Sequence, residues 1–205
     1  MLKQVALVAL MGLSASAMAG QWQVKLGGSA VAPTQESNVT SLVGATTVEA
    51  DSELAFTPSV EYFFNDNFSA ELLLATPINH DVDVTAAGAN IAGVKLKHLP
   101  PTITAKYNFK NSTGFTPYIG IGATAFIPWD EETSGALAGT TVKVKEDFGY
   151  AGQIGFNFQP ADAKNWGVFA DVRYADLNPK VETAVGNFKL DIDPVIYTLG
   201  YSYKF

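Results

Sequence analysis

The sequence of 205 residues contains no cysteine and only two histidines. The absence of cysteine excludes disulfide bonds and thiolate metal sites. Basic residues are scarce as well, since 13 Lys and Arg stand against 20 Asp and Glu and the net charge is −7. We therefore expect no binding to nucleic acid. No apolar run after residue 20 approaches the roughly 20 residues of a transmembrane helix, so a membrane-spanning mature chain has to be a closed β-barrel.

The N-terminal segment has the pattern of a secretory signal peptide. Lys3 precedes an apolar run over residues 5–13, and Ala17 and Ala19 form an A-x-A cleavage pattern before Gly20. The run is too short for a membrane anchor. We predict a signal peptide over residues 1–19 and a single β-barrel domain over residues 20–205. Loss of Lys3 changes the net charge from −7 to −8.

The C-terminal segment alternates aromatic residues with others. Tyr201, Tyr203 and Phe205 occupy every second position, and Phe205 is the last residue. Alternation of this kind is typical of a strand with one apolar face. A final strand that ends on Phe is typical of bacterial outer-membrane barrels. These three residues are thus predicted to be recognised by the barrel assembly machinery, which places the protein in the outer membrane.

Alternating segments predict an all-β fold, an eight-stranded antiparallel transmembrane barrel. The predicted strands are residues 21–32, 54–64, 68–76, 96–109, 115–126, 148–158, 166–174 and 194–205. Short turns alternate with four long loops, and the long loops are residues 33–53, 77–95, 127–147 and 175–193. Short periplasmic turns and long extracellular loops are typical of outer-membrane barrels.

Every predicted strand carries an aromatic residue at its short-turn end. Representative members of this ring are Trp22, Phe64, Phe68, Phe109 and Phe205. A complete aromatic ring at one level is what a membrane interface selects. The ring also defines the outward face of each strand, so the inward residues follow by alternation.

The sequence resembles the outer-membrane protein W (OmpW) family over essentially the whole mature chain. The matching stretches are Trp22-Gln23-Val24-Lys25-Leu26-Gly27, Ala75-Thr76-Pro77-Ile78-Asn79-His80-Asp81, Lys97-His98-Leu99-Pro100-Pro101-Thr102, Thr116-Pro117-Tyr118-Ile119-Gly120-Ile121-Gly122 and Asp193-Pro194. The resemblance implies a narrow apolar lumen that passes small hydrophobic molecules, with sideways release into the membrane. Outer-membrane lipids and small hydrophobic solutes are then the expected partners, and no cofactor is expected.

Charged residues among the inward positions predict a plug near the periplasmic end. Lys25, Glu61, Glu71 and Lys106 each lie three residues from an aromatic of the ring, so they share a level about 7 to 8 Å above it. Asp171 and Arg173 also point inward. Acids and bases at one level pair across a dry interior, because an unpaired buried charge costs several kcal/mol.

Above this level the inward positions are small or apolar, with Arg173 as the charged exception. The predicted lumen-lining residues are Leu73, Ala75, Gly120, Gly122, Ala151, Phe169 and Ile196. They describe a funnel open to the outside and closed beneath by the plug. An eight-stranded barrel has room only for its own side chains or one small ligand, so a water-filled porin is not expected.

Three prolines predict a weak seam beside the fourth strand. Pro100 and Pro101 lack an N–H, and adjacent residues direct their donors to opposite neighbours, so each seam is expected to lose one hydrogen bond. Pro77, at the top of the neighbouring third strand, is expected to weaken the seam between these two strands further. Pro101 lies about 20 Å above the aromatic ring, at the depth of the outer leaflet. Either the prolines form a lateral opening or they only end the ladder near the loop.

Two other function classes stay open. The first is a structural, adhesive or receptor barrel that acts through its extracellular loops. The second is a lipid-modifying enzyme, for which His80 and His98 have no evident Ser partner in strand phase, so no catalytic residues are assigned. The same two histidines, without a third ligand at a typical spacing, do not define a metal site. A passive channel for small hydrophobic molecules is the preferred interpretation.

Overall fold

The computed structural model describes residues 21–34, 37–41, 44–50, 52–86, 89–136, 138–183 and 186–205. Within these ranges no helix is long and apolar enough to cross a membrane. The predicted signal peptide over residues 1–19 lies outside the described residues and stays a prediction.

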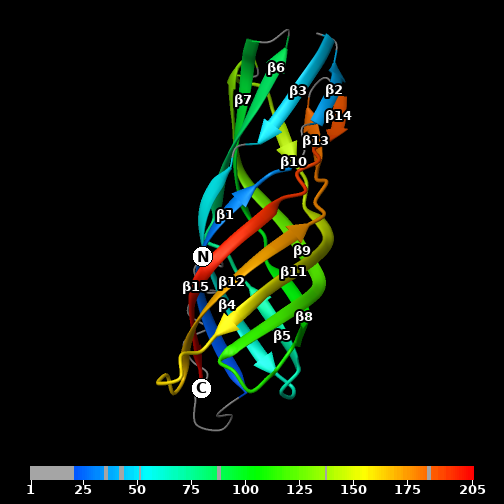
Figure 1. Ribbon diagram of the computed structural model, residues 1–205. Coiled ribbons are helices and arrows are strands. Elements are labelled where there is room, and N and C mark those ends of the chain that lie inside the picture. Colours follow the sequence, from blue (N-terminus) through cyan, green and yellow to red (C-terminus); the bar gives the residue numbers. More distant parts are fainter. Residues whose placement is uncertain are drawn as a thin grey trace, which may run out of the picture.

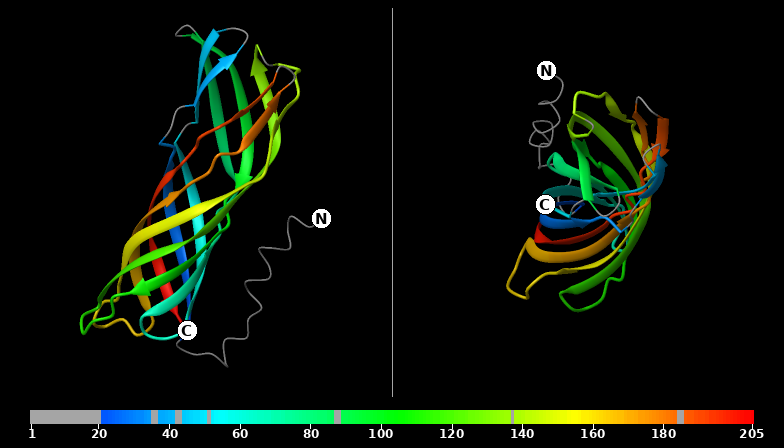
Figure 2. Two further views of the ribbon diagram at one scale, coloured as in Figure 1. Left: turned by 90° about the vertical axis from the view of Figure 1, so that its right-hand side faces the viewer. Right: turned by 90° about the horizontal axis from the view of Figure 1, so that it is seen from above.

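Eight antiparallel strands close into a barrel (Figures 1 and 2). In order around the barrel they are β11 (Asp147–Phe158), β12 (Trp166–Ala175), β15 (Val195–Lys204), β1 (Trp22–Ala32), β4 (Glu53–Phe63), β5 (Phe68–Leu73), β8 (Thr102–Asn108) and β9 (Phe115–Gly135). Pairing of β9 with β11 closes the sheet, and the first and last strands of the barrel are neighbours. The predicted eight-stranded antiparallel barrel is confirmed. Closure pairs the backbone groups that an open edge would expose to lipid.

Strands also form outside the barrel, where the sequence predicted long loops. They are β2 (Ser37–Ser41), β3 (Gly44–Ala50), β6 (Ile78–Ala86), β7 (Ala89–Leu99), β10 (Val142–Val144), β13 (Lys180–Thr183) and β14 (Gly186–Lys189). The order β9-β7-β6-β3-β2 continues the barrel sheet upward on one side, and β10-β13-β14 forms a separate small sheet. Figure 1 shows both above the barrel. The conformation of these long connections was left open by the sequence, and their strands carry few of the aromatic residues that mark the membrane interface.

The predicted fourth strand is divided in the structure. Residues 96–109 were expected to run as one strand, whereas β7 ends at Leu99 and β8 begins at Thr102. Pro100 and Pro101 occupy the interruption, and proline has no N–H to contribute to a ladder.

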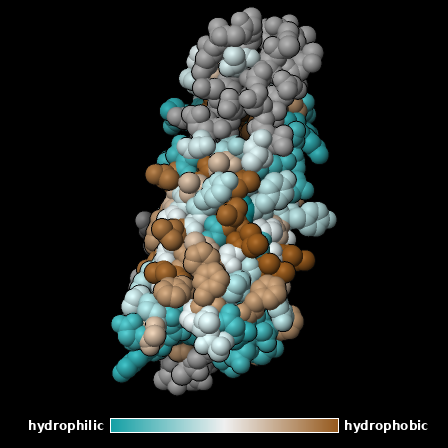
Figure 3. Space-filling model, in the orientation of Figure 1, coloured by the Kyte–Doolittle hydropathy of each residue, from teal (hydrophilic) through white to brown (hydrophobic). Residues whose placement is uncertain are grey.

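The outer face of the barrel is apolar and the lower end is aromatic. Large outward side chains are well exposed, including Ile121 at 74% and Leu199 at 69%. At the lower end rings from neighbouring strands pack together, for example Trp22 with Tyr62 at a centroid distance of 4.9 Å. Figure 3 shows apolar side chains gathered over the middle of the visible face, with hydrophilic residues below them. This pattern matches a transmembrane barrel with an aromatic belt.

The C-terminus lies in this lower belt beside the start of β1 (Figure 2). The Phe205 N–H donates to the Trp22 carbonyl oxygen at 2.9 Å, and Tyr201, Tyr203 and Phe205 are all at least 40% exposed. The alternation predicted for the last strand is therefore confirmed, with its aromatic face outward.

Candidate functional site

Six charged side chains meet inside the lower half of the barrel. They come from five strands, none is more than 4% exposed, and we call them the ionic cluster. Its members are Lys25, Glu61, Glu71, Lys106, Asp171 and Arg173.

Four members form a compact double pair. Lys25 Nζ lies 2.7 Å from Glu61 Oε2 and 3.6 Å from Glu71 Oε2. Lys106 Nζ donates to both carboxylates, at 2.9 Å in each case. Each ammonium group therefore contacts both acids. These are the four residues that strand phase placed at one level, and the structure brings their charged groups together.

Arg173 and Asp171 complete the ionic cluster from β12. Arg173 Nη2 donates to Glu71 Oε1 at 3.0 Å and to Asp171 Oδ2 at 2.9 Å, and Arg173 Nε donates to Asp171 Oδ1 at 3.0 Å. The sequence placed Arg173 above the charged level, but its long side chain brings the guanidinium to Glu71. With three cations and three carboxylates the formal charges cancel, which a buried cluster requires.

Neutral side chains satisfy the remaining carboxylate oxygens. Ser59 donates to Glu71 Oε1 at 2.7 Å, and Ser69 donates to Glu61 Oε1 at 2.6 Å. Gln153 Nε2 donates to Thr104 Oγ1 at 2.6 Å and lies 3.5 Å from Glu71 Oε2. Glu71 is thus the most connected acid, contacted by three cations and two neutral donors.

Tyr118 is a member of this region that the sequence analysis did not assign. It is fully buried, and its hydroxyl donates to Asp171 Oδ2 at 2.9 Å. Lys106 Nζ lies 3.7 Å from the centroid of its ring and Lys25 Nζ lies 4.9 Å from it, both within the range of cation–π attraction. Tyr118 lies two residues before the inward-facing Gly120. The alternation of side chains along the strand therefore also predicts that Tyr118 faces inward.

Two residues predicted to line the upper lumen lie beside the ionic cluster instead. A Cβ on Gly120 would lie 2.8 Å from Gln153 Cγ and 3.0 Å from Lys106 Cγ. The Phe169 ring centroid lies 5.1 Å from Lys25 Nζ. Gly120 therefore gives room for the cluster's side chains, and Phe169 packs against one of its cations.

A small apolar cavity of about 30 Å³ lies above the ionic cluster. Its lining includes Leu73, Ala75 and Ile196, three of the residues proposed from the sequence for the upper lumen. Gly120, Gly122, Ala151 and Phe169 are not among its lining residues. His98, Phe126, Leu177 and Ile192 also border the cavity, and their inward side chains make the upper interior narrower than the open funnel that the sequence predicted.

The cavity borders an apolar core that the extracellular segments form above it. Buried members of this core come from β7, β9, β10, β12 and β13, from the connection before β13 and from the connection after β14. Phe126, Ala175, Leu177 and Ile192 belong both to this core and to the cavity wall. One apolar region therefore extends from the extracellular sheets to the ionic cluster.

The barrel ladder is interrupted at the level of the cavity. On one side β5 pairs with β8 up to Leu73 opposite Thr102, and β6 resumes with β7 at Ile78 opposite His98. Residues 74–77 and residues 99–101 lie between these two points, and they are not paired with each other in a β-ladder across that seam. Leu74 and Thr76 instead donate their N–H groups to β4 carbonyl oxygens, each at 2.8 Å.

The other seam beside the prolines is held more firmly than expected. The Ala125 N–H donates to the Pro101 carbonyl oxygen at 3.0 Å. The register is the same below and above the prolines, with Thr102 opposite Thr124 and Leu99 opposite Ile127. The expected loss on the β9 side is therefore small, whereas the seam that Pro77 was expected to weaken further has lost its pairing. The seam between residues 74–77 and 99–101 is the interrupted one, because Pro77 and the end of β5 add their own loss of pairing there.

His98 lies at this interruption and borders the cavity. Its side chain is 5% exposed, and its ring stacks on Phe126 at a centroid distance of 4.5 Å. The side chains of His80 and Asp81 lie outside the described part of the structure. Among the described residues, no group of three or more His, Cys, Asp or Glu is placed to hold a metal ion.

A closed antiparallel barrel with an apolar outer face, an aromatic lower belt and a charge-balanced interior defines the protein as an outer-membrane β-barrel. Comparison with known proteins gives the family. The sequence model of the OmpW family matches residues 18–205. The chain belongs to the OmpW family, and it is located in the bacterial outer membrane.

Known proteins of this family resemble the chain over almost its full length. Outer membrane protein W of Vibrio cholerae is 30% identical over 198 residues, with 91% of this chain and 89% of that protein covered. The crystal structure of OprG from Pseudomonas aeruginosa has a TM-score of 0.78 at 28% identity and covers 91% of this chain and 96% of OprG. Outer membrane protein W of E. coli has a TM-score of 0.63 at 26% identity, with 92% and 100% covered. All three are named as outer membrane proteins.

Proposed function

We propose that the barrel passes small hydrophobic molecules from outside the cell into the outer membrane through its upper interior. The observation that carries this proposal is the position of the apolar cavity. Leu73, Ala75 and Ile78 line it from one edge of the interrupted seam, and His98, Pro100 and Thr102 line it from the other. A solute in the cavity would therefore lie directly behind the weakest part of the barrel wall.

The ionic cluster supports this route by closing the way down. Its six charged groups are buried and mutually paired, so a molecule that separated them would leave unpaired charges in a dry interior. Breaking a buried pair of this kind costs about 3–5 kcal/mol. An apolar solute offers no compensating hydrogen bond. The favourable exit is sideways through the seam between residues 74–77 and 99–101.

The route is closed in the structure. A volume of about 30 Å³ holds roughly one water molecule. Passage therefore requires movement of the apolar side chains above and around the cavity, such as Phe126 and Leu177. These side chains pack through apolar contacts. An apolar solute that displaces them can therefore make equivalent contacts in their place.

Uptake of a small apolar fluorophore by intact cells tests the proposal. Ala75→Phe places a large side chain in the cavity and should lower uptake to the level of cells that lack the protein. The matched control is Ala123→Phe, because Ala123 faces outward on β9 and its replacement leaves the interior unchanged. Both variants are checked for folding by heat-dependent gel migration.

The seam is tested separately by restoring one of its hydrogen-bond donors. The Pro101 carbonyl oxygen already accepts from Ala125, so position 101 faces β9 and position 100 faces the interrupted seam. Pro100→Val therefore supplies one N–H group to that seam and should slow uptake, while Ala123→Phe does not. Uptake that is unaffected by Ala75→Phe would contradict the cavity route. It would favour the alternative of a structural, adhesive or receptor barrel that acts through its extracellular segments. Reduced uptake in Ala75→Phe with normal uptake in the proline variant would contradict the lateral exit alone.

The outward aromatic face of the last strand supports a second element of the proposal. Tyr201, Tyr203 and Phe205 present alternating rings on the outside of β15. We assign to them the recognition of this strand by the barrel assembly machinery before the barrel closes.

A further inference from the structure

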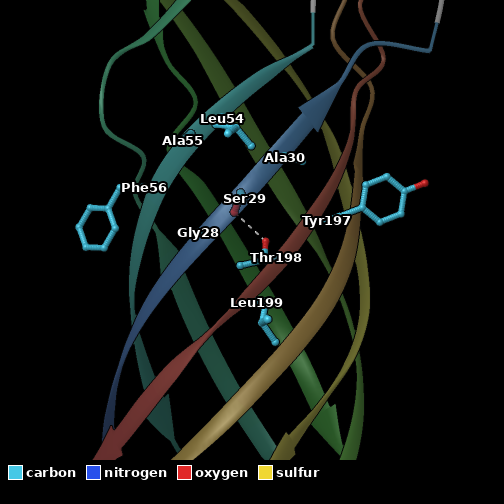
Figure 4. Close-up of a pocket in the computed structure, with 9 residues that line it drawn as sticks. All are labelled: Gly28, Ser29, Ala30, Leu54, Ala55, Phe56, Tyr197, Thr198 and Leu199. Carbon is cyan, nitrogen blue, oxygen red and sulfur yellow. Dashed lines mark hydrogen bonds between the residues drawn. The ribbon is translucent and has the colours of Figure 1, made fainter.

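The outer face of the barrel carries an apolar groove on the strands β15, β1 and β4. It has a volume of about 580 Å³, and we call it the outer groove. Its lining residues are Gly28, Ser29, Ala30, Leu54, Ala55, Phe56, Tyr197, Thr198 and Leu199. Figure 4 shows β1 between the other two strands, with the Phe56 and Tyr197 rings on opposite sides of it.

The floor of the outer groove is low because β1 carries small outward residues there. A Cβ added to Gly28 would meet no atom within 4 Å. No neighbouring atom of the protein therefore requires glycine at this position, and the space above it is open. Ala30 continues the same outward face one step higher, so the depression follows the strand.

The floor is also held firmly from inside the barrel. Ser29 Oγ lies 2.6 Å from Thr57 Oγ1 and 2.8 Å from Thr198 Oγ1. These buried hydrogen bonds tie β1 to both of its neighbours directly beneath the outer groove. The groove is thus formed before anything binds, which lowers the entropic cost of binding.

The walls are hydrocarbon and well exposed. Leu54 is 84% exposed, Leu199 is 69% exposed and Phe56 is 47% exposed. The nine lining residues include no Lys, Arg, Asp or Glu, so the outer groove offers no charged partner for a phosphate or an amine. Its chemistry fits a hydrocarbon chain and not a polar headgroup.

The outer groove lies at the depth of the outer leaflet. Gly28 and Ala30 are six and eight residues above Trp22 in the lower belt, which places them about 15 to 20 Å above that belt. The groove is continuous with the lipid-facing surface of the barrel. At this depth the surrounding molecules are the acyl chains of membrane lipids.

We propose that the outer groove is a binding site for one acyl chain of an outer-leaflet membrane lipid. The acyl chain of the lipid lies along β1 over Gly28 and Ala30, between the Leu199 and Phe56 sides of the groove. The proposal is independent of the transport route, because the outer groove is on the outside of the barrel and shares no residue with the apolar cavity.

The experiment uses the purified full barrel in phospholipid vesicles that contain a lipid with a photoactivatable group in the middle of one acyl chain. Cross-linked residues are mapped by mass spectrometry. We expect labelling at Gly28, Ala30 and Leu199 to exceed by several-fold that of equally exposed residues elsewhere in the band, such as Ile121. Gly28→Leu should abolish the excess by filling the floor.

Matched controls separate the groove from general lipid contact. Gly152 faces outward on β11 outside the groove, and a Cβ there would have its nearest contact at 4.0 Å. Gly152→Leu should leave the labelling unchanged. If Gly28→Leu does not fold, Leu199→Ala removes one wall and should also lower the excess, whereas Ile154→Ala should not.

Two outcomes would overturn the proposal. One is labelling that is even around the apolar band and insensitive to both groove variants. The other is cross-linking of the groove residues to a second protein chain in place of lipid, which would identify the groove as a contact between barrels.

Discussion

Replacement of Glu71 by Gln should strongly destabilise the barrel. Glu71 is fully buried and accepts from Lys106, Arg173 and Ser59, with Lys25 3.6 Å away. Glutamine keeps the size of the side chain but removes its charge. The ionic cluster would then hold three cations against two carboxylates, and one buried positive charge would be uncompensated.

The magnitude follows from this imbalance. Removal of one partner from a buried ion pair costs about 3–5 kcal/mol, whereas replacement of a whole pair by neutral groups is often close to neutral. The double variant Glu71→Gln/Lys106→Met removes one charge of each sign and leaves Lys25 and Arg173 opposite Glu61 and Asp171. We therefore expect the double variant to be more stable than Glu71→Gln alone.

Urea unfolding in phospholipid vesicles, followed by tryptophan fluorescence, measures both free energies of unfolding. Glu182→Gln is the control, because Glu182 pairs with Lys145 at 3.1 Å on an exposed extracellular strand and exposed pairs contribute little. Its unfolding midpoint should match the wild type. The reasoning is refuted if Glu71→Gln loses less than about 1 kcal/mol, or if the double variant is less stable than the single one.

Three further predictions concern other parts of the molecule. Gly122→Ala should lower the unfolding midpoint in vesicles, because its Cβ would overlap the Ile103 carbonyl oxygen, while Gly28→Ala, with open space at that position, should not. Burial, with help from neighbouring carboxylates, raises the pKa of the Asp193 carboxyl. Its contribution to stability is therefore present below the ordinary pKa and is lost as the pH rises through the raised one. Asp193→Asn should accordingly raise the thermal midpoint at pH 7 and leave it unchanged at pH 3, and a midpoint that falls at pH 7 would contradict this. Deletion of Phe205 should reduce the amount of folded barrel in the outer membrane of cells more than it reduces folding of the purified chain into vesicles, and equal losses would contradict recognition by the assembly machinery.

Much of the barrel could be predicted because strand geometry converts sequence spacing directly into position. Successive side chains point to opposite faces, so the outward aromatics determined which residues face inward. The same counting from Trp22, Phe64, Phe68 and Phe109 placed Lys25, Glu61, Glu71 and Lys106 at one level, and the structure shows their charged groups in contact.

Other features depend on where side chains end, which strand phase does not give. The reach of Arg173 down to Glu71 depends on the length and rotamer of its side chain. The width of the upper interior depends on how Phe126, Leu177 and Ile192 pack against one another across strands that are distant in sequence. The strands above the membrane could not be assigned from the sequence, because segments such as Gly44–Ala50 lack the aromatic markers of a lipid interface.

The sequence alone therefore determined the membrane location, the number of strands in the barrel, the inward and outward faces and the level of the charged residues. All of these follow from a period of two residues and from the requirement that backbone groups in lipid be paired. The tertiary structure decided that Tyr118 joins the ionic cluster, that one seam beside the prolines is interrupted, and that Gly28 forms the floor of a groove. Each of these depends on contacts between strands brought together only when the barrel closes.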